Sequence, residues 1–437
     1  MEKKTAVGIV GGLGHIGLIQ AACLAKLGYK SIAYDINSAK IKDIQRGKMP
    51  FYEPGLEELV HETMDNGLLV FTTRVTDLQE AEMIFICTGT PALPSGEADT
   101  SQVYSAIEEV ARHRSNQALV IIKSTVPAGT CRKIAAFLQE RDLAARAAVV
   151  SCPEFLREGS GVQDFWKPSR IVVGAPSRET AEKVAGLYSP PGIPILLTTW
   201  ENAELIKHAS NAFLASKISF INEIALLCEQ VGADIRVVSR GIGLDPRINP
   251  HFLEAGIGFS GPCLEKDLKS LLRQFQEAKK EAKLLEAALR VNEEKRREIV
   301  HKLQAKLGGL RGRRIAVLGM AFKPQTDDVR DSHSLPIIKQ LLSAGASVTV
   351  HDPWIKSPRG GRLAENDLPG VEWASSPHAA AQGKDALLIL TAWPEYRELD
   401  LKQIKDCLAV PLIVDGRNIY ESGQLRELGI DYQGVGI

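Results

Sequence analysis

Short apolar runs alternate with helical patterns from the start of the chain to about residue 195. The runs are rich in Val, Ile and Ala, and they are continuous rather than alternating with polar residues. They lie at Ala6–Val10, Ser31–Tyr34, Met83–Cys87, Leu119–Ile122, Ala148–Ser151 and Ile171–Val173. Strands of a parallel sheet have this composition when helices cover both faces. The pattern therefore predicts a doubly wound α/β domain.

Two later segments have the periodicity of helices. From Asn202 to Val231, and from Leu268 to about Leu307, apolar residues recur three and four positions apart with charged residues between them. This spacing predicts amphipathic helices. The longer segment is a candidate bridge between domains and a candidate dimer surface, although most long amphipathic helices pack only on their own chain.

Apolar runs return after the glycine-rich segment 307–312. They lie at Ile315–Leu318, Val348–His351, Leu387–Leu390 and Leu412–Val414. The sequence thus predicts an α/β fold with two Rossmann-like, doubly wound domains joined by a central helical region that contains a long helix. We expect domains at residues 1–200, 201–306 and 307–437. Ligands are expected at the carboxyl ends of strands and in the cleft between the lobes.

Composition narrows the classes of partner. The chain has 437 residues, too many for one hydrophobic core. Its 53 basic and 53 acidic side chains give a net charge of zero, without the excess positive charge expected of a protein that binds nucleic acid or an anionic membrane. Glycines interrupt the first apolar run, which predicts a buried strand and not a signal peptide or a span. Seven scattered cysteines without a C-x-x-C pair indicate a reduced, cytoplasmic compartment and no bound metal.

A dinucleotide-binding fingerprint follows the first predicted strand. Gly12, Gly14 and Gly17 stand at the spacing G-x-G-x-x-G and open a helical pattern. Such glycines permit a tight turn and a close approach of the backbone to a pyrophosphate, which binds at the helix N-terminus. Asp35 ends the second predicted strand, where a carboxylate binds both adenosine ribose hydroxyls. It favours NAD over NADP, although the nearby Lys40 weakens this distinction.

Cys263 lies in a glycine-rich loop, residues 256–267, and is followed closely by Lys266 and Asp267. A cysteine in apolar surroundings is usually a small core residue, and we interpret Cys23, Cys87, Cys228 and Cys407 in this way. Cys263 differs because glycines flank it and charges follow it. Its thiolate could be stabilised by Lys207 or Lys266 and by a helix that starts near Asp267. Together with a nicotinamide, such a thiol predicts an oxidation that continues past an aldehyde to an acid.

Other polar side chains are candidates for the same chemistry, each with a simpler alternative. Lys207 and Asn211 share one helix face and could stabilise an oxyanion, but the commoner meaning of this spacing is a solvated pair. Glu154 and Glu158 follow the fifth predicted strand and suit water activation or ligand contact, yet a solvated turn has the same composition. The loops 88–91 and 123–130 carry hydroxyls that suit the nicotinamide side of the site, or ordinary turn chemistry.

Several ordered motifs resemble one family along nearly the whole chain, the nucleotide-sugar 6-dehydrogenases, which include UDP-glucose and GDP-mannose dehydrogenases. These motifs are the glycine fingerprint, Glu53–Leu56, Lys123–Pro127, Pro153–Gly159, Lys207 with Asn211, the Cys263 loop, Phe322–Pro324, Thr326–Arg330 and Asp415–Asn418.

The resemblance implies an NAD-dependent, four-electron oxidation of a sugar C6 hydroxyl to a carboxylate, through a thiohemiacetal and a thioester on Cys263. Lys207 and Asn211 would stabilise oxyanions, while Thr125, Glu154 and Asp267 would position or activate water. The residues implied to contact NAD are Asp35, Lys40, Thr90, Thr125, Glu158 and Arg330. Those implied to contact the nucleotide sugar are Glu154, Phe155, Leu156, Lys207, Asn211, Phe252, Gly256, Gly261 and Lys323, with Arg247 reaching the substrate of a partner subunit in a homodimer.

The run Pro153–Gly159 resembles the UDP-glucose and GDP-mannose branch more than the N-acetylhexosamine branch, and UDP-glucose is the favoured substrate. Three residues depart from the usual motifs: Ser260 replaces a glycine, Glu265 replaces a proline, and Cys152 stands where Asn is common. GDP-mannose and a UDP-N-acetylhexosamine remain alternative substrates, and two alternatives to this activity also remain. One is an NAD-binding homologue that has lost catalysis, and the other is a two-electron hydroxyacid dehydrogenase, which would leave Cys263 and the C-terminal domain unexplained.

Overall fold

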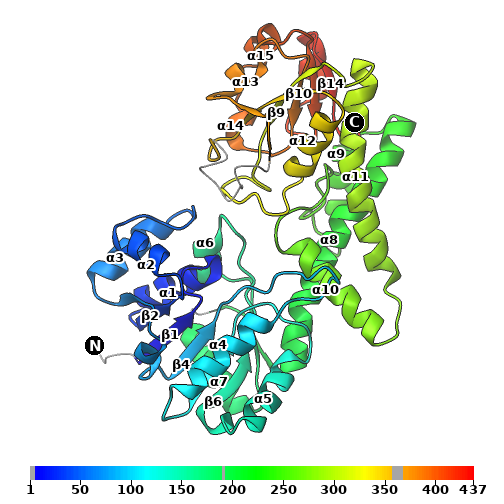
Figure 1. The fold of residues 1–437 in the computed structure, drawn as a ribbon. Helices are drawn as coiled ribbons and strands as arrows, with labels where there is room; N and C mark the ends of the chain where they lie inside the picture. Colours follow the sequence, from blue (N-terminus) through cyan, green and yellow to red (C-terminus); the bar gives the residue numbers. More distant parts are fainter. Residues whose placement is uncertain (1–4, 189–191, 357–367) are drawn as a thin grey trace. The chain divides into compact units, whose positions relative to one another are not determined.

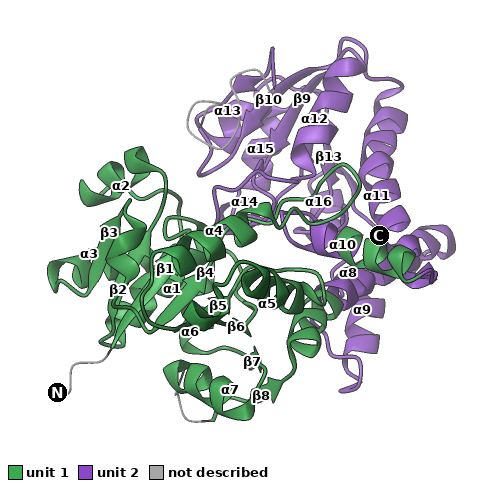
Figure 2. Ribbon diagram, turned by 60° about the horizontal axis from the view of Figure 1, so that its bottom comes forward, with its two compact units in different colours: residues 1–210, 269–278 green, residues 211–268, 279–437 purple. Residues whose placement is uncertain are grey.

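The computed structural model describes residues 5–188, 192–356 and 368–437. The chain forms two compact units, which Figure 2 distinguishes by colour. Unit 1 comprises residues 1–210 and 269–278, and unit 2 comprises residues 211–268 and 279–437. Each unit contains one sheet.

Unit 1 is built on an eight-stranded sheet with the order β3-β2-β1-β4-β5-β6-β7-β8. Its strands are β1 (Ala6–Val10), β2 (Lys30–Tyr34), β3 (Leu69–Thr72), β4 (Met83–Ile86), β5 (Ala118–Ile122), β6 (Ala147–Ser151), β7 (Ile171–Gly174) and β8 (Ile195–Thr198). The first six strands are parallel and follow the 3-2-1-4-5-6 order of dinucleotide-binding sheets. The six predicted strands are present, and the sequence pattern missed β3 and β8.

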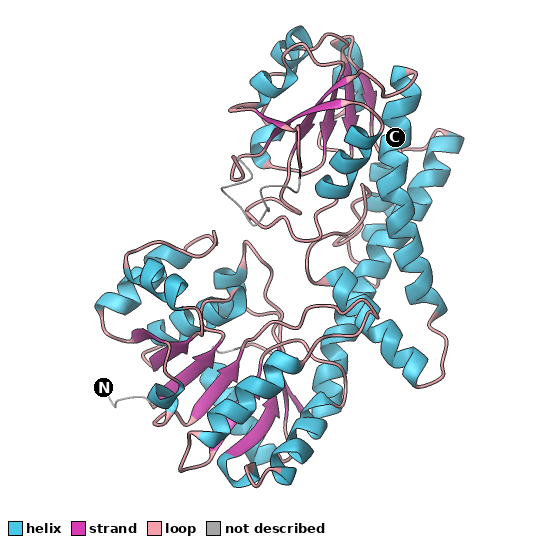
Figure 3. Ribbon diagram, viewed as in Figure 1, coloured by secondary structure: helices cyan, strands magenta, loops and turns pink. Residues whose placement is uncertain are grey.

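Helices cover both faces of this sheet (Figures 1 and 3). One buried cluster packs side chains of α1 (His15–Lys26), α3 (Leu56–Asp65) and α7 (Arg178–Ala185) against the sheet. A second cluster contains side chains of α4 (Ser101–Arg112) and α5 (Thr130–Glu140). The shorter helices are α2 (Ser38–Gln45) and α6 (Gly161–Trp166). Two separate cores explain why the strands are apolar without alternation.

The helical middle of the chain contains α8 (Trp200–Val231), α9 (Ile235–Gly243), α10 (Leu264–Glu277) and α11 (Lys283–Leu307). The expectation of one continuous helix from Leu268 to Leu307 is wrong, because the chain breaks between α10 and α11. Residues 276–281 include no large apolar side chain that could anchor another turn, and Lys279 adopts a positive φ of 55°. The sequence pattern also missed α9.

Within the described ranges, α8 is the one helix whose length and composition would allow it to cross a membrane. Core helices of globular domains pass the same test, so this is weak evidence for a span. Moreover, α8 buries the polar side chains of Glu204, Lys207 and His208, which are costly in hydrocarbon.

Unit 2 contains a fully parallel six-stranded sheet with the order β11-β10-β9-β12-β13-β14. Its strands are β9 (Arg314–Leu318), β10 (Ser347–His351), β11 (Glu372–Trp373), β12 (Ala386–Ile389), β13 (Leu412–Asp415) and β14 (Asp431–Gln433). The helices are α12 (Ser334–Ser343), α13 (Pro377–Ala381), α14 (Pro394–Arg397), α15 (Leu401–Cys407) and α16 (Ser422–Glu427). The four predicted strands are present, while the short edge strands β11 and β14 were missed.

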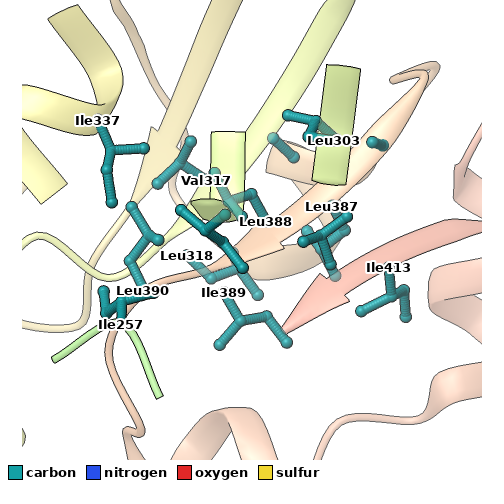
Figure 4. Close-up of a cluster of buried hydrophobic side chains, with 14 of the residues drawn as sticks. Ile257, Leu303, Val317, Leu318, Ile337, Leu387, Leu388, Ile389, Leu390 and Ile413 are labelled. Atoms are coloured by element: carbon teal, nitrogen blue, oxygen red, sulfur yellow. The ribbon is translucent and has the colours of Figure 1, made fainter. Parts of the chain in front are cut away.

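The core of unit 2 joins the sheet to the segment that carries Cys263. Figure 4 shows Ile257 in the same buried cluster as Leu318 and Leu390, together with Leu303 of α11. The predicted α/β fold, with two Rossmann-like sheets and a long helix between them, is confirmed. The boundary between the compact units falls inside α8, so the three-domain division of the sequence stays a prediction.

Candidate active site

The turn between β1 and α1 can accept no side chain at two of its three fingerprint glycines. A Cβ on Gly17 would lie 2.1 Å from the carbonyl oxygen of Gly11, and a Cβ on Gly12 would lie 2.8 Å from the Cβ of Ala33. Gly14, the N-cap of α1, provides no side-chain cap to the first turn. The amides of this turn are therefore suited to an anionic group.

Asp35 follows β2, and its Oδ2 accepts a hydrogen bond from the amide of Leu13 at 3.1 Å. Its carboxylate is thereby held beside the glycine turn, as a ribose ligand must be. The backbone amide of Lys40 is bonded to Asn37, and its side chain is exposed. The turn and the acid together fit NAD, which when bound supplies the hydride acceptor of a dehydrogenase.

His15, inside the fingerprint, connects this turn to the Pro153–Gly159 loop. Its Nε2 lies 3.0 Å from Oε2 of Glu53, and its Nδ1 lies 3.6 Å from Oε1 of Glu158. The buried Glu53 also accepts the amides of Gly159 and Gly161 at 2.8 and 2.7 Å. The role of Glu53 as a link was not predicted, since its motif gives no sign of its distant partners.

The two hydroxyl-bearing loops of unit 1 meet. The hydroxyl of Thr90 donates to the carbonyl of Thr125 at 2.9 Å. The Thr125 loop continues into α5, whose N-terminal amides at Gly129 and Cys131 donate to the buried Glu204 of α8 at 2.6 and 2.7 Å. Burial raises the pKa of Glu204 against the lowering effect of these hydrogen bonds. Glu204 was not predicted, because in the sequence it looks like any other helical glutamate.

Lys207 and Glu154 form a buried ion pair within unit 1. The ammonium of Lys207 lies 2.9 Å from Oε1 of Glu154, and the two side chains are 6% and 9% exposed. The other carboxylate oxygen accepts the amide of Leu156 at 2.6 Å, and Phe155 lies under the ammonium at 5.5 Å. Burial excludes the solvated alternative for both charged residues.

Cys263 is the exposed member of the seven free cysteines, all of which lie in described parts of the chain. It directly precedes α10, and its carbonyl accepts the amide of Asp267 at 2.9 Å. The helix begins at Leu264, three residues before the expected start near Asp267. Glu265 and Asp267 therefore lie in its first turn. The start at Leu264 places the thiol beside the N-terminus of a helix, where a thiolate is stabilised.

Asn211 and Asp267 meet within unit 2. The amide nitrogen of Asn211 donates to Oδ2 of Asp267 at 2.6 Å, and both side chains are buried. The ammonium of Lys266 lies 2.5 Å from Oδ1 of the same carboxylate. Asn211 stands one helical turn after Lys207, so α8 carries both expected oxyanion donors. Lys207 belongs to unit 1 and Asn211 to unit 2.

Four further residues of unit 2 are expected to contact the substrate. Gly256 and Gly261 are required sterically, because a Cβ would lie 2.7 Å from the carbonyl oxygen of Gly416 and 2.5 Å from the ring of Phe322, respectively. Lys323 lies 5.7 Å from that same ring. Phe252 has an unusual positive φ of 64°.

The two arginines expected to bind ligands are paired with neighbouring carboxylates. Arg247 is 87% exposed and lies 2.6 Å from Asp245, while Nε of Arg330 donates to Asp328 at 2.8 Å. The structure therefore does not join Arg247 to the cysteine loop of its own chain through a described contact. This position is compatible with a role toward another molecule.

The structure accommodates the three departures from the family motifs. Ser260 lies outside the positive-φ region, and its hydroxyl donates to the carbonyl of Phe322 at 3.2 Å. Glu265 is half-buried in the first turn of α10, where acidic residues are favourable. Cys152 is buried, with its sulfur 3.8 Å from the ammonium of Lys123.

These features define an NAD-dependent dehydrogenase with an exposed cysteine at a helix N-terminus. The chain belongs to the UDP-glucose/GDP-mannose dehydrogenase family. Its NAD binding domain matches residues 5–191, its central domain residues 201–294 and its UDP binding domain residues 316–422.

Individual relatives agree with this assignment. UDP-glucose 6-dehydrogenase TuaD of Bacillus subtilis is 41% identical over 97% of this chain and 92% of its own length. UDP-glucose 6-dehydrogenase of Rhizobium meliloti is also 41% identical, over 97% and 98%. Among solved structures, the UDP-glucose dehydrogenase from Pyrobaculum islandicum has a TM-score of 0.90 and 37% identity, covering 100% of this chain and 98% of that one. UDP-D-ManNAc dehydrogenase from Pyrococcus horikoshii has a TM-score of 0.86 and 30% identity, over 99% of both.

Proposed function

We propose that this protein is a UDP-glucose 6-dehydrogenase, which oxidises the C6 hydroxyl of UDP-glucose to the carboxylate of UDP-glucuronate with two NAD. The observation that carries the proposal is the placement of Cys263, the exposed thiol, at the N-terminus of α10. A dehydrogenase that stops at an aldehyde or ketone needs no nucleophile. The names of the relatives favour UDP-glucose as the sugar nucleotide.

Three residues have proposed roles once the C6 aldehyde has formed. Cys263 adds through its sulfur to the C6 aldehyde and forms a thiohemiacetal, which the second oxidation converts to a thioester. Water then adds to the thioester carbonyl, and the thiol leaves as the carboxylate forms. Each tetrahedral species carries an oxyanion that Lys207 and Asn211 would stabilise, as a charged and a neutral donor.

Glu154 and Asp267 are the proposed water-handling carboxylates, assisted by Thr125. Each carboxylate already contacts one of the oxyanion donors, with Lys207–Glu154 in unit 1 and Asn211–Asp267 in unit 2. A carboxylate that is hydrogen-bonded to such a donor fixes the donor's orientation and can accept a proton from water. The buried pairs therefore support a role for all four residues.

Ligand contacts are proposed for two sets of residues. NAD would be held by Gly12, Gly14, Gly17, Asp35, Lys40, Thr90, Thr125, Glu158 and Arg330. The nucleotide sugar would be held by Glu154, Phe155, Leu156, Lys207, Asn211, Phe252, Gly256, Gly261 and Lys323, with Arg247 provided by a second subunit. No metal takes part in this scheme.

We further propose a cytoplasmic homodimer that forms through α8. Phe213, Phe220 and Leu227 recur every seven residues on this helix and are 67%, 52% and 60% exposed, and Val231 extends the stripe. Exposed apolar residues that recur along one face of a long helix are typical of a self-association surface. A reduced, cytoplasmic compartment is supported by the seven free cysteines.

The first experiment counts NADH formed per UDP-glucose consumed by the purified protein. We expect two NADH per sugar, and loss of turnover in Cys263→Ser. One NADH per sugar would contradict the covalent mechanism. Absence of NADH from UDP-glucose, with oxidation of GDP-mannose or a UDP-N-acetylhexosamine, would replace the substrate but keep the reaction.

A further inference from the structure

We infer that Asn292 of α11 is a positioning residue for Cys263. This inference rests on the proposed role of Cys263 as the nucleophile. Asn292 is 2% exposed and lies far from the cysteine in sequence. Its contacts are with the backbone of the cysteine loop.

The side chain of Asn292 makes a two-point contact with Phe259. Its Oδ1 accepts the amide of Phe259 at 2.7 Å, and its Nδ2 donates to the carbonyl of Phe259 at 3.0 Å. One side-chain amide thus satisfies both backbone groups of a buried loop residue, as a neighbouring strand would. The contact fixes the position and the orientation of this peptide segment.

The preceding residue is adapted to this contact. Gly258 has a φ of 95°, and a Cβ at this position would lie 2.2 Å from Oδ1 of Asn292. Only glycine combines this backbone conformation with so close an approach. The contact of Asn292 with the loop therefore requires glycine at position 258. Apolar packing alone would not impose this requirement.

From Phe259 onward, successive residues transmit this position to the thiol. The hydroxyl of Ser260 donates to the carbonyl of Phe322 at 3.2 Å, and the amide of Gly261 donates to the carbonyl of Asp331 at 3.1 Å. Pro262 has a fixed φ, and Cys263 is tied to the first turn of α10. A shift at Phe259 therefore changes the backbone that leads into Cys263, and with it the orientation of the thiol at the helix N-terminus.

The start of the loop is anchored independently. The amide of Gly256 donates to Oδ1 of the buried Asn222 on α8 at 3.0 Å, and the amide of Ile257 donates to the carbonyl of Gly416 at 3.0 Å. Ile257 is also buried in the core cluster shown in Figure 4. Removal of the Asn292 contact should therefore free the backbone of Phe259 and loosen the segment that leads to Cys263, while the other hydrogen bonds keep the loop attached.

The test measures the alkylation rate of Cys263 by iodoacetamide in the folded full-length protein, with no substrate present. Since the other cysteines are buried or half-buried, Cys263→Ser gives the background rate. We expect Asn292→Leu to slow alkylation about fivefold or more, because the thiol loses its fixed orientation at the helix N-terminus. We also expect kcat to fall about tenfold or more with a smaller change in KM.

Ser219→Ala is the matched control. The buried hydroxyl of Ser219 on α8 donates to the carbonyl of Ala288, one turn before Asn292 on α11, at 2.7 Å. This variant removes a buried hydrogen bond of the same helix without touching the loop. Its Tm should fall, while its alkylation rate should stay within about twofold of wild type, since the thiol environment is unchanged.

Asn292→Asp provides a second variant if Asn292→Leu does not fold. It keeps the acceptor for the amide of Phe259 and loses the donor to its carbonyl, so an intermediate alkylation rate is expected. An unchanged or faster rate in a folded Asn292 variant would overturn the inference. If the rate depends on Asn292 but wild type oxidises no nucleotide sugar, only the proposed function fails.

Discussion

Lys207 and Glu154 show how a single buried contact can serve both stability and chemistry. Breaking a buried ion pair from one side leaves an uncompensated charge, which costs about 3–5 kcal/mol. Loss of activity in a single variant therefore does not distinguish a catalytic lysine from a structural one. The distinction needs a variant that removes the stranded charge as well.

We predict that Lys207→Met lowers both Tm and kcat, with kcat falling by about a factor of 100 or more if the lysine stabilises an oxyanion. The double variant Lys207→Met/Glu154→Gln should recover most of the Tm, because no charge remains buried alone, but none of the kcat. Thermal melts and steady-state rates of the three proteins provide the measurement. Recovery of kcat along with Tm would assign both Lys207 and Glu154 purely structural roles.

His333 carries a prediction about pH. It is buried beside the loop that contains Gly258, and burial, with smaller contributions from Arg417 and Arg296, lowers its pKa from 6.5 to about 3. Between about pH 3 and pH 6.5, His333 is therefore protonated in the unfolded chain and neutral in the folded chain. The stabilisation is complete above pH 6.5 and is lost as the pH falls toward 3. At pH 5 the loss is about 2 kcal/mol by linkage.

The measurement compares the Tm at pH 7.5 and pH 5.0 for wild type and for His333→Gln. We expect the variant to lose less Tm on acidification than wild type, because its buried side chain does not titrate. The exposed His113→Gln should retain the wild-type pH dependence. An equal loss in wild type and His333→Gln would show that other groups cause the acid sensitivity.

At the scale of elements, the strands that helices cover on both faces could be predicted, because a continuous apolar run can be recognised from the local sequence alone. The short strands β11 and β14 could not, since two or three edge residues leave no distinctive pattern. The same limit applies to the site. Cys263 and the glycine turn are marked by local sequence, whereas Glu53, Glu204 and Asn292 act on amides far along the chain. Only the fold reveals such partners.

The turn between β1 and α1 allows two functions of glycine to be separated. Gly14 has a φ of −74°, and its Cβ would meet the carbonyl of Gly11 at 3.3 Å, whereas the Cβ of Gly17 would lie 2.1 Å from it. We predict that Gly17→Ala weakens NAD binding and also lowers Tm, because backbone must move. Gly14→Ala should weaken NAD binding with little change in Tm, since its Cβ comes no closer to the protein than 3.3 Å but adds bulk to the turn proposed to hold the pyrophosphate.

Calorimetric titration with NAD and thermal melts check both variants. Gly186→Ala is the control, because its φ of −59° suits alanine and its Cβ would meet nothing within 4 Å. It should leave both quantities at wild-type values. A large Tm loss in Gly14→Ala would mean that this glycine serves the fold and not the cofactor.

At the scale of the whole molecule, the stripe on α8 and the position of Arg247 suggest one explanation. The buried face of the helix packs Ala215, Ile221 and Ala225 within its own chain, while Phe220 and Leu227 face outward. If a second copy covers that outer face, the exposed Arg247 has a partner chain to act on. A monomer would then lack one substrate contact, although each chain would keep its own Cys263.

We therefore predict that Phe220→Asp yields a folded monomer with a raised KM for UDP-glucose, because a charge in the centre of the stripe opposes association. Size-exclusion chromatography with light scattering gives the mass, and steady-state kinetics gives KM. Val410→Asp, at an exposed apolar residue on a loop of unit 2, is the control and should remain a dimer. Arg247→Ala in the dimer should raise KM by a similar factor, whereas adding it to Phe220→Asp should have no further effect. A dimeric Phe220→Asp protein would place the interface elsewhere, and an additive effect of the two substitutions would show that Arg247 acts within its own chain.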